Sequence, residues 1–311
     1  MAEHRFDGVY AATTTPLRAD GSVDVERYRK HCAWLVDEGV AGIIPNGSLG
    51  EYEALTDEER QSLVTAAVEA AGSRADIVPG VSGKSAAEAS QWAEQAKAAG
   101  APAVMALPPT SHKPTDDEVI AHFAAIGQTG LPIIAYNNPF STRVDLTPAL
   151  LARLASEVPM VAAVKEFSQD VRRVWQIRES APGLEVICGC DDTLVEAMLG
   201  GAVGWIAGFV NALPGPSVHL FRLCQEGRYA EAATLYRVLL PLLRWDADPL
   251  FVQAIKLAQH EAGRYGGPVR LPRLPLPEQT SAQVRAQVRA ALAALGTVGT
   301  AEALDTLEPD H

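Results

Sequence analysis

Residues 103–139 read AVMALPPTSHKPTDDEVIAHFAAIGQTGLPIIAYNNP and contain, in order, a predicted strand, helix and strand. The outer runs, AVMALPP (103–109) and LPIIAYNNP (131–139), are short and apolar, which is typical of buried strands. The run between them, TDDEVIAHFAAIG (115–127), has the periodicity of a helix. Two strands connected by a helix in this way are expected to run parallel in one sheet.

The same alternation repeats along most of the chain. Helical patterns recur at 25–39, 56–72 and 85–100, and two helices have the spacing of a capping box at their start, Thr56 with Glu59 and Thr115 with Glu118. We predict eight strands, at 8–16, 42–47, 76–81, 103–109, 131–139, 160–167, 184–190 and 204–211.

Eight parallel strands that alternate with helices close most naturally into a barrel. An open sheet of that size would need a visible change in strand order and usually a nucleotide-binding loop. No GxGxxG or GxxxxGK[ST] motif follows any predicted strand. We therefore predict an α/β fold, a (β/α)8 TIM barrel, which suits a chain of 311 residues.

The sequence after the eighth strand contains more helix than one barrel needs. Helical patterns continue to residue 263, and the proline-rich run PVRLPRLPLPE (268–278) leads into a last helix. We predict one domain over 1–300 with a C-terminal helical extension at about 225–296, which covers a barrel face or an oligomer contact. A disordered tail is expected at 301–311.

Composition argues against several classes of partner. The formal net charge is −12, and no cluster of Lys and Arg suggests binding to nucleic acid or to an anionic membrane surface. No apolar run approaches the roughly 18 residues of a membrane span, and the N-terminus lacks the pattern of a signal peptide. We expect a cytoplasmic protein. We also expect an anionic substrate to be held by hydrogen-bond donors in the pocket rather than attracted by the overall charge of the protein.

Four cysteines, Cys32, Cys188, Cys190 and Cys224, are too few and too scattered for a disulfide framework, which fits a reducing compartment. Cys188 and Cys190 have no second close Cys or His pair that would complete a metal site. We expect core or pocket-lining cysteines, and neither a metal nor another cofactor.

Lys165 lies near the end of the predicted strand MVAAVKEF (160–167), where the chemistry of such barrels is found. Burial in an apolar wall would lower the pKa of its ammonium and make the amine a nucleophile towards carbonyls. The alternative is a lysine that reaches solvent or pairs with Glu166. Position alone favours neither interpretation.

Two further strand ends carry polar groups. Tyr136, in IIAYNNP (133–139), can act as a general acid and base, or it can be a buried tyrosine that bonds a backbone carbonyl. GSLGE (47–51) supplies glycines, backbone N–H groups and the Ser48 hydroxyl, so it is a candidate nest for a carboxylate. Ordinary loop chemistry explains such a turn as well, and Glu51 is expected to close it. Asp191 or Asp192 is expected to cap the following helix.

Together these motifs resemble the dihydrodipicolinate synthase and N-acetylneuraminate lyase superfamily of class I aldolases, dehydratases and deaminases. The resemblance spans about residues 6–230 and rests on four motifs: TTTP near the first strand, GSLGE after the second, YNNP after the fifth and VKEFSQD at the sixth. It implies a small 2-oxo acid or cyclic imine carboxylate as substrate, no cofactor, and a homo-oligomer, either a tetramer or a dimer.

The resemblance also implies roles for single residues. Lys165 matches the Schiff-base lysine, Tyr136 the proton-shuttling tyrosine and Ser48 the hydroxyl that relays protons to it. Gly47, Ser48 and Leu49 match the turn that holds the substrate carboxylate, and Leu49 departs from the hydroxyl residue of many members. Ile206 matches a position whose carbonyl lines the pocket.

Two departures argue against a dihydrodipicolinate synthase. Ser111 stands where that enzyme has a tyrosine from a neighbouring subunit, and Ser141 stands where it has an arginine for a second carboxylate. Arg143 is two residues further on.

The segments GSLGEY, IIAYNNP, VKEFSQDVRR and LLRWDADPLFVQAIK (242–256) look most like 1-pyrroline-4-hydroxy-2-carboxylate deaminases, which form 2,5-dioxopentanoate and ammonia. Three alternatives stay open. The chain is an aldolase or dehydratase of a 2-keto-3-deoxy sugar acid, a 4-hydroxy-tetrahydrodipicolinate synthase, or a non-catalytic binding protein on the same barrel.

Overall fold

The computed structural model of the protein describes residues 6–296. Eight parallel strands form one curved sheet in the order β3-β2-β1-β8-β7-β6-β5-β4, and a parallel bridge from Gly80, just after β3, to Met105 in β4 joins its two edges. The predicted barrel is confirmed. The strands are β1 (Gly8–Ala12), β2 (Gly42–Ile44), β3 (Asp76–Ile77), β4 (Val104–Ala106), β5 (Ile133–Asn137), β6 (Val161–Glu166), β7 (Glu185–Cys188) and β8 (Gly204–Ala207).

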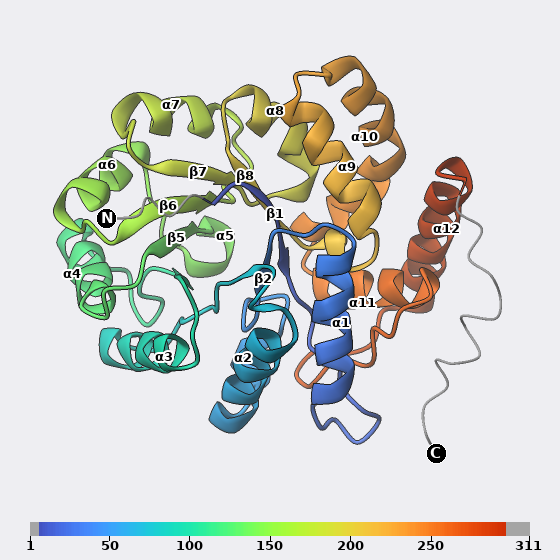
Figure 1. Ribbon diagram of the computed structural model, residues 1–311, viewed down its shortest axis with the longest axis horizontal. Coiled ribbons are helices and arrows are strands. Elements are labelled where there is room, and N and C mark those ends of the chain that lie inside the picture. Colours follow the sequence, from blue (N-terminus) through green and yellow to red (C-terminus); the bar gives the residue numbers. More distant parts are fainter. Residues whose placement is uncertain (1–5, 297–311) are drawn as a thin grey trace.

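Helices surround the strands (Figure 1). Both predicted capping boxes are present: the side chains of Thr56 and Thr115 accept the N3 amides, and Glu59 and Glu118 bond back to the cap amides. The barrel helices are α1 (Val25–Asp37), α2 (Asp57–Ala71), α3 (Ala86–Ala98), α4 (Asp116–Gly127), α5 (Pro139–Thr142), α6 (Pro148–Glu157), α7 (Arg172–Ser180), α8 (Leu194–Leu199) and α9 (Pro214–Gln225).

The observed strands are shorter than the predicted ones, mainly at their carboxyl ends. Short 3-10 turns follow three of them: η1 (Tyr52–Ala54), η2 (Asp191–Thr193) and η3 (Phe209–Asn211). Apolar runs do not reveal where a strand stops pairing, because the residues just beyond it are also buried. These turns place polar residues at one end of the barrel.

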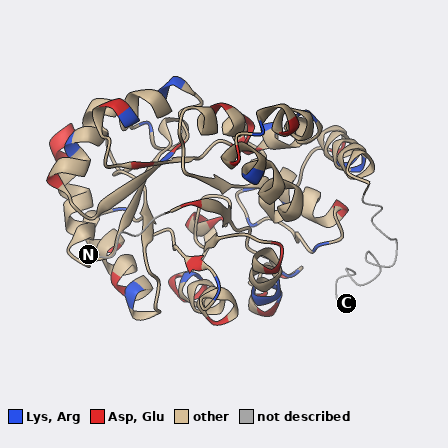
Figure 2. Cartoon of the chain, turned by 45° about the horizontal axis from the view of Figure 1, so that its top comes forward, with Lys and Arg blue, Asp and Glu red and all other residues tan. Residues whose placement is uncertain are grey.

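Charged side chains of both signs are mixed on the outer helices, whereas the strands carry few of them (Figure 2). This distribution follows from burial, since an unpaired charge inside the barrel would be costly. Within residues 6–296, no helix is both long and apolar enough to cross a membrane.

The C-terminal segment adds α10 (Tyr229–Leu243), the turn η4 (Arg244–Ala247), α11 (Phe251–Glu261) and α12 (Glu278–Ala294). The predicted extension is confirmed in part. α9 packs against β1 as the eighth barrel helix, so the added segment begins with α10. The turn η4 contacts η2, and α11 contacts η3, so the added helices cover the carboxyl ends of β7 and β8. The predicted tail at 301–311 lies outside the described residues.

A buried ion pair fastens this segment to the barrel. Lys256 in α11 lies 2.8 Å from Glu51 of the GSLGE turn, and the two side chains are 2% and 1% exposed. Lys256 also donates to the carbonyl of Pro268, and Glu51 accepts the backbone N–H of Arg270. The Arg270 guanidinium in turn binds Glu59 in α2. Glu51 closes its own turn through its backbone N–H, which donates to the Ser48 carbonyl, and its side chain holds the chain 205 residues away.

We expect Lys256→Met to lower the free energy of unfolding by about 3–5 kcal/mol, the cost of leaving one member of a buried pair without its partner. Urea unfolding followed by circular dichroism measures this loss.

The double variant Glu51→Gln/Lys256→Met is the matched control, because it removes both charges and should cost less than the single change. Arg153→Met, which breaks exposed pairs with Asp117 and Glu157, should cost below about 1 kcal/mol. If Lys256→Met lowered the free energy of unfolding by less than about 1 kcal/mol, the proposed anchoring of the C-terminal segment by this ion pair would be contradicted.

Candidate active site

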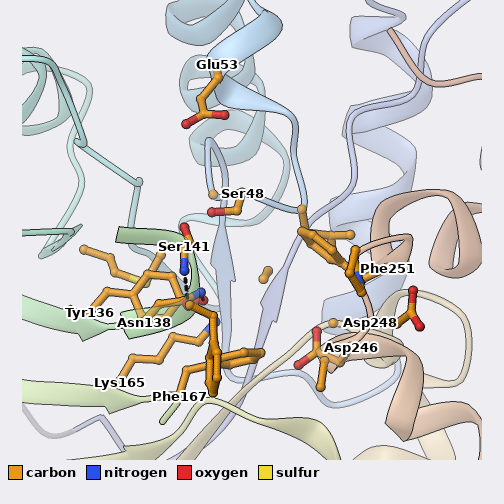
Figure 3. A pocket seen from close by; sticks show the side chains of 18 of the residues that line it. Ser48, Glu53, Tyr136, Asn138, Ser141, Lys165, Phe167, Asp246, Asp248 and Phe251 are labelled. Atoms are coloured by element: carbon orange, nitrogen blue, oxygen red, sulfur yellow. Dashed lines mark hydrogen bonds between the residues drawn. The ribbon is translucent and has the colours of Figure 1, made fainter. Parts of the chain in front are cut away.

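A cavity of about 370 Å³ opens where the carboxyl ends of the strands meet the C-terminal segment (Figure 3). Five of the six predicted site residues line it, namely Gly47, Ser48, Leu49, Tyr136 and Lys165. The opposite wall comes from the C-terminal segment and consists of Asp246, Ala247, Asp248, Pro249, Phe251 and Arg273.

Lys165 lies in β6 with its side chain turned into the barrel. It is 6% exposed and pairs in register with Tyr136 of β5, so both side chains project to the same side of the sheet. Gly189, after β7, makes room for it, because a Cβ there would lie 2.9 Å from Lys165 Cγ. The ammonium is 4.4 Å from the centre of the Tyr136 ring.

Lys165 has no ion-pair partner among the described residues. The alternative partner, Glu166, accepts from the Asn137 amide and from the backbone N–H of Ser168 instead. Neighbouring residues of a strand point to opposite faces, which separates these two side chains. The structure therefore excludes both ordinary explanations of Lys165, a solvent-exposed ammonium and a pair with Glu166.

Tyr136 is buried, and its hydroxyl accepts a hydrogen bond of 2.9 Å from the Asn138 amide. Burial raises the pKa of Tyr136, while the positive charge of Lys165 and the bond from Asn138 oppose the rise. Phe167 meets the ring edge-on, with 6.4 Å between centroids. The phenol is thus held in its protonated form beside Lys165.

The GSLGE turn is closed by its own backbone. The amides of Gly50 and Glu51 donate to the carbonyls of Gly47 and Ser48. In the part of the chain that the structure describes, the amides of Ser48 and Leu49 have no protein acceptor. Two such donors beside a cavity can accept an anionic oxygen.

The structure differs from three of the sequence predictions. Ile206 is buried in β8, opposite Tyr10, and does not line the cavity, whereas Gly208 two residues later does. Ser48 shares the cavity with Tyr136, but the tyrosine hydroxyl bonds Asn138. The predicted helix cap at Asp191 or Asp192 is wrong, since α8 has Thr193 at its N-cap and no side chain caps it. The Asp191 carboxylate instead accepts from the Trp205 indole and from the backbone amides of Gly208 and Phe209.

Ser141 lines the cavity, and Ser111 lies on an exposed loop outside its lining. Arg143 is exposed and likewise does not contribute to the lining.

Comparison with known proteins assigns this arrangement to a family. The model of the dihydrodipicolinate synthetase family matches residues 5–291. The chain belongs to the dihydrodipicolinate synthetase family.

Similar family members are named 4-hydroxy-tetrahydrodipicolinate synthase. That of Maridesulfovibrio salexigens is 31% identical over 92% of this chain and 98% of its own length, and that of Methylobacterium radiotolerans is 34% identical over 90% and 94%. Such membership makes the chain a lyase of the class I aldolase type.

Solved structures of similar proteins have the same fold. The 4-hydroxy-tetrahydrodipicolinate synthase of Methylacidiphilum fumariolicum superposes with a TM-score of 0.89 at 28% identity, covering 94% of this chain and 99% of that one. A prophage protein of the family from E. coli K12, solved with pyruvate, has a TM-score of 0.87 at 29% identity, covering 93% and 99%.

The cavity wall has further polar residues that the sequence analysis did not single out. Asn138 stood inside a quoted motif without being named as a site residue. Asp246 and Arg273 come from the C-terminal segment, and neither stands in a strand. Arg273 has no hydrogen-bonding or ion-pair partner for its guanidinium within residues 6–296, although it lies on the cavity wall.

Proposed function

We propose that this family member forms a Schiff base between Lys165 and C2 of a small 2-oxo-acid-like substrate. The observation that carries the proposal is a buried lysine that has no ion pair within residues 6–296 and lies in register with a buried tyrosine on the wall of one cavity. A desolvated amine in this position is a nucleophile towards carbonyl and imine carbons.

The other residues take complementary roles in this scheme. Tyr136 is the general acid and base, because its protonated hydroxyl lies beside Lys165. The amides of Ser48 and Leu49 hold the substrate carboxylate at the turn that begins with Gly47, and the Ser48 hydroxyl assists proton transfer. A role for the Ile206 carbonyl stays a prediction.

The substrate we favour is 4-hydroxy-1-pyrroline-2-carboxylate. Lys165 adds to the C2 imine carbon, the ring opens, the 4-hydroxyl leaves as water, and hydrolysis at C5 releases ammonia and 2,5-dioxopentanoate. The net reaction consumes one water. Ser141 on the cavity wall suits this substrate, which has only one carboxylate, and the carboxylates of Glu53, Asp246 and Asp248 favour formation of a cationic ammonium in the cavity.

Ammonia release tests this choice of substrate. The wild-type protein should release one ammonia per molecule of 4-hydroxy-1-pyrroline-2-carboxylate consumed, measured with a coupled dehydrogenase, and none from a 2-keto-3-deoxy sugar acid. Release of pyruvate or water from the sugar acid, without ammonia from the pyrroline, would assign the site to an aldolase or dehydratase. No turnover with any substrate would favour the binding protein.

A 4-hydroxy-tetrahydrodipicolinate synthase is the second candidate. Its support is the name of the similar proteins and the position of Arg273 on the cavity wall. The Arg273 guanidinium has no partner in the described part of the chain and can bind a second carboxylate that Ser141 does not.

A synthase of this type would condense pyruvate with aspartate semialdehyde. This candidate therefore predicts that Arg273→Gln raises KM for aspartate semialdehyde by about 10- to 100-fold, the value of a charge-assisted bidentate contact. KM for pyruvate should change little, because Lys165 and the GSLGE turn hold that substrate. Steady-state kinetics with each substrate varied in turn measures both effects.

Arg143→Gln is the matched control, since Arg143 is exposed and away from the cavity. Equal KM values for Arg273→Gln and wild type would remove the argument for the synthase that rests on Arg273. We also expect a homo-oligomer, tetramer or dimer, which light scattering after size exclusion measures.

A further inference from the structure

Asp246 lies in the cavity wall opposite the strand ends, where Gly208 leaves room for its carboxylate. It lies in η4 and lines the cavity with Lys165 and Gly208. A Cβ on Gly208 would come within 2.5 Å of Asp246 Oδ1, so the carboxylate rests where a side chain is missing. The other oxygen, Oδ2, accepts the backbone N–H of Asp191 at 3.3 Å.

The Asp246 carboxylate faces the reacting side of the cavity. Figure 3 shows it turned towards the side that holds Lys165 and Phe167, whereas Asp248 points away. Asp248 stabilises its own turn, because its Oδ1 accepts the backbone N–H of Leu250. Among the described residues, Asp246 accepts only the long bond from Asp191, which leaves most of its bonding capacity unused in a buried place.

Several titratable groups surround Asp246. Lys165 and Tyr136 face it from β6 and β5, and Asp191, Asp192, Cys188 and Cys190 face it from the end of β7.

Burial raises the pKa of Asp246 to about 6, and the positive charge of Lys165 opposes the rise. The pKa would therefore rise further if Lys165 lost its proton. Burial and the charge of Asp246 also raise the pKa of Asp191.

We propose that Asp246 is a second acid–base group of the active site, which takes the proton from Lys165 and then gives it to the group that leaves C2. The inference rests on the proposed Schiff-base function and adds a residue to it. It assigns the two sides of the substrate to different proton carriers, with Tyr136 on one side and Asp246 on the other.

The proton and electron movements balance. The Lys165 ammonium gives one proton to the Asp246 carboxylate. The free Nζ lone pair then forms a bond to C2, while the π electrons of the C2=N bond move to the ring nitrogen. The ring nitrogen takes one proton from Nζ, which restores a lone pair on Nζ, and a second proton from Asp246, which is again a carboxylate. That lone pair forms the C2=Nζ double bond as the bond from C2 to the ring nitrogen breaks and its electron pair stays on the departing amine. With a ketone substrate the leaving group is the C2 hydroxyl, which departs as water.

The test is the pH profile of kcat/KM for wild type and Asp246→Asn, with 4-hydroxy-1-pyrroline-2-carboxylate or pyruvate as the Schiff-base-forming substrate. Wild-type activity should rise with pH through about 6, because Asp246 must be ionised to take the proton. Asp246→Asn should lower kcat/KM by about 10²- to 10⁴-fold and lose this limb. Its rate should instead increase with hydroxide concentration.

Asp192→Asn is the matched control. It removes a carboxylate that raises the pKa of Asp246 but does not line the cavity. The rate should stay within about 3-fold, while the acid limb moves to slightly lower pH because a negative charge near Asp246 is gone. Asp246→Ala with added formate is the second variant, since a small acid that enters the vacated space should restore part of the activity.

The outcomes separate this inference from the function on which it rests. An unchanged acid limb in Asp246→Asn, with kcat/KM within about 3-fold of wild type and an adduct still trapped on Lys165, would overturn the role of Asp246 alone. Loss of activity without a change in the pH profile and without rescue by formate would also overturn it, since a structural role predicts that pattern. Failure to trap any adduct on wild-type Lys165 would overturn the function itself.

Discussion

Lys165→Ala should abolish turnover while leaving the barrel folded. The amine that bonds C2 is lost, and no other described lysine lines the cavity. The fold should persist, because alanine is accepted in a buried strand and the change removes a buried charge that has no ion-pair partner within residues 6–296. Steady-state assays and thermal unfolding of the same preparation measure both effects.

Lys30→Ala is a suitable control, since Lys30 is exposed on α1 and pairs only with Glu26 there. It should match wild type in rate and in melting temperature. Activity of Lys165→Ala near that of Lys30→Ala would rule out the Schiff-base mechanism.

Tyr136→Phe should lower kcat by about 10²- to 10⁴-fold, the range for the loss of a general acid or base. Phenylalanine keeps the ring that contacts Lys165 and Phe167, so the geometry of the lysine should survive. The hydroxyl and its bond from Asn138 disappear. A Schiff base should still form slowly, so single-turnover kinetics should separate the two steps.

Tyr28→Phe provides the comparison. Tyr28 is a buried tyrosine whose hydroxyl bonds Thr13, and it does not line the cavity. Its loss should affect stability but not rate. If the two variants had the same kcat, Tyr136 would have no part in proton transfer.

Much of the fold could be predicted from the sequence because the information is local. Each strand is a short apolar run, and helix starts such as Thr56 and Thr115 carry their caps within four residues. Lys165 and Tyr136 stood out for the same reason, since a polar residue at the end of an apolar strand is conspicuous, and the parallel sheet then places the two side by side.

The opposite wall of the cavity could not be predicted because it depends on contacts between distant parts of the chain. No periodicity shows that the C-terminal segment returns to the GSLGE turn through Lys256 and Glu51. Without that contact, Asp246 and Arg273 look like ordinary surface charges. Asp191 was misassigned for a related reason, because its partners are the amides of η3, which follow the next strand.

Borohydride trapping tests the central proposal most directly. The protein is reduced in the presence of 4-hydroxy-1-pyrroline-2-carboxylate, pyruvate or a 2-keto-3-deoxy sugar acid, offered separately, and the adduct is located by peptide mass spectrometry. The account predicts an adduct of the pyrroline on Lys165, accompanied by ammonia release. Adducts only with pyruvate or the sugar acid would keep Lys165 as the nucleophile but contradict the deaminase, and the absence of any adduct on Lys165 would contradict the Schiff-base mechanism.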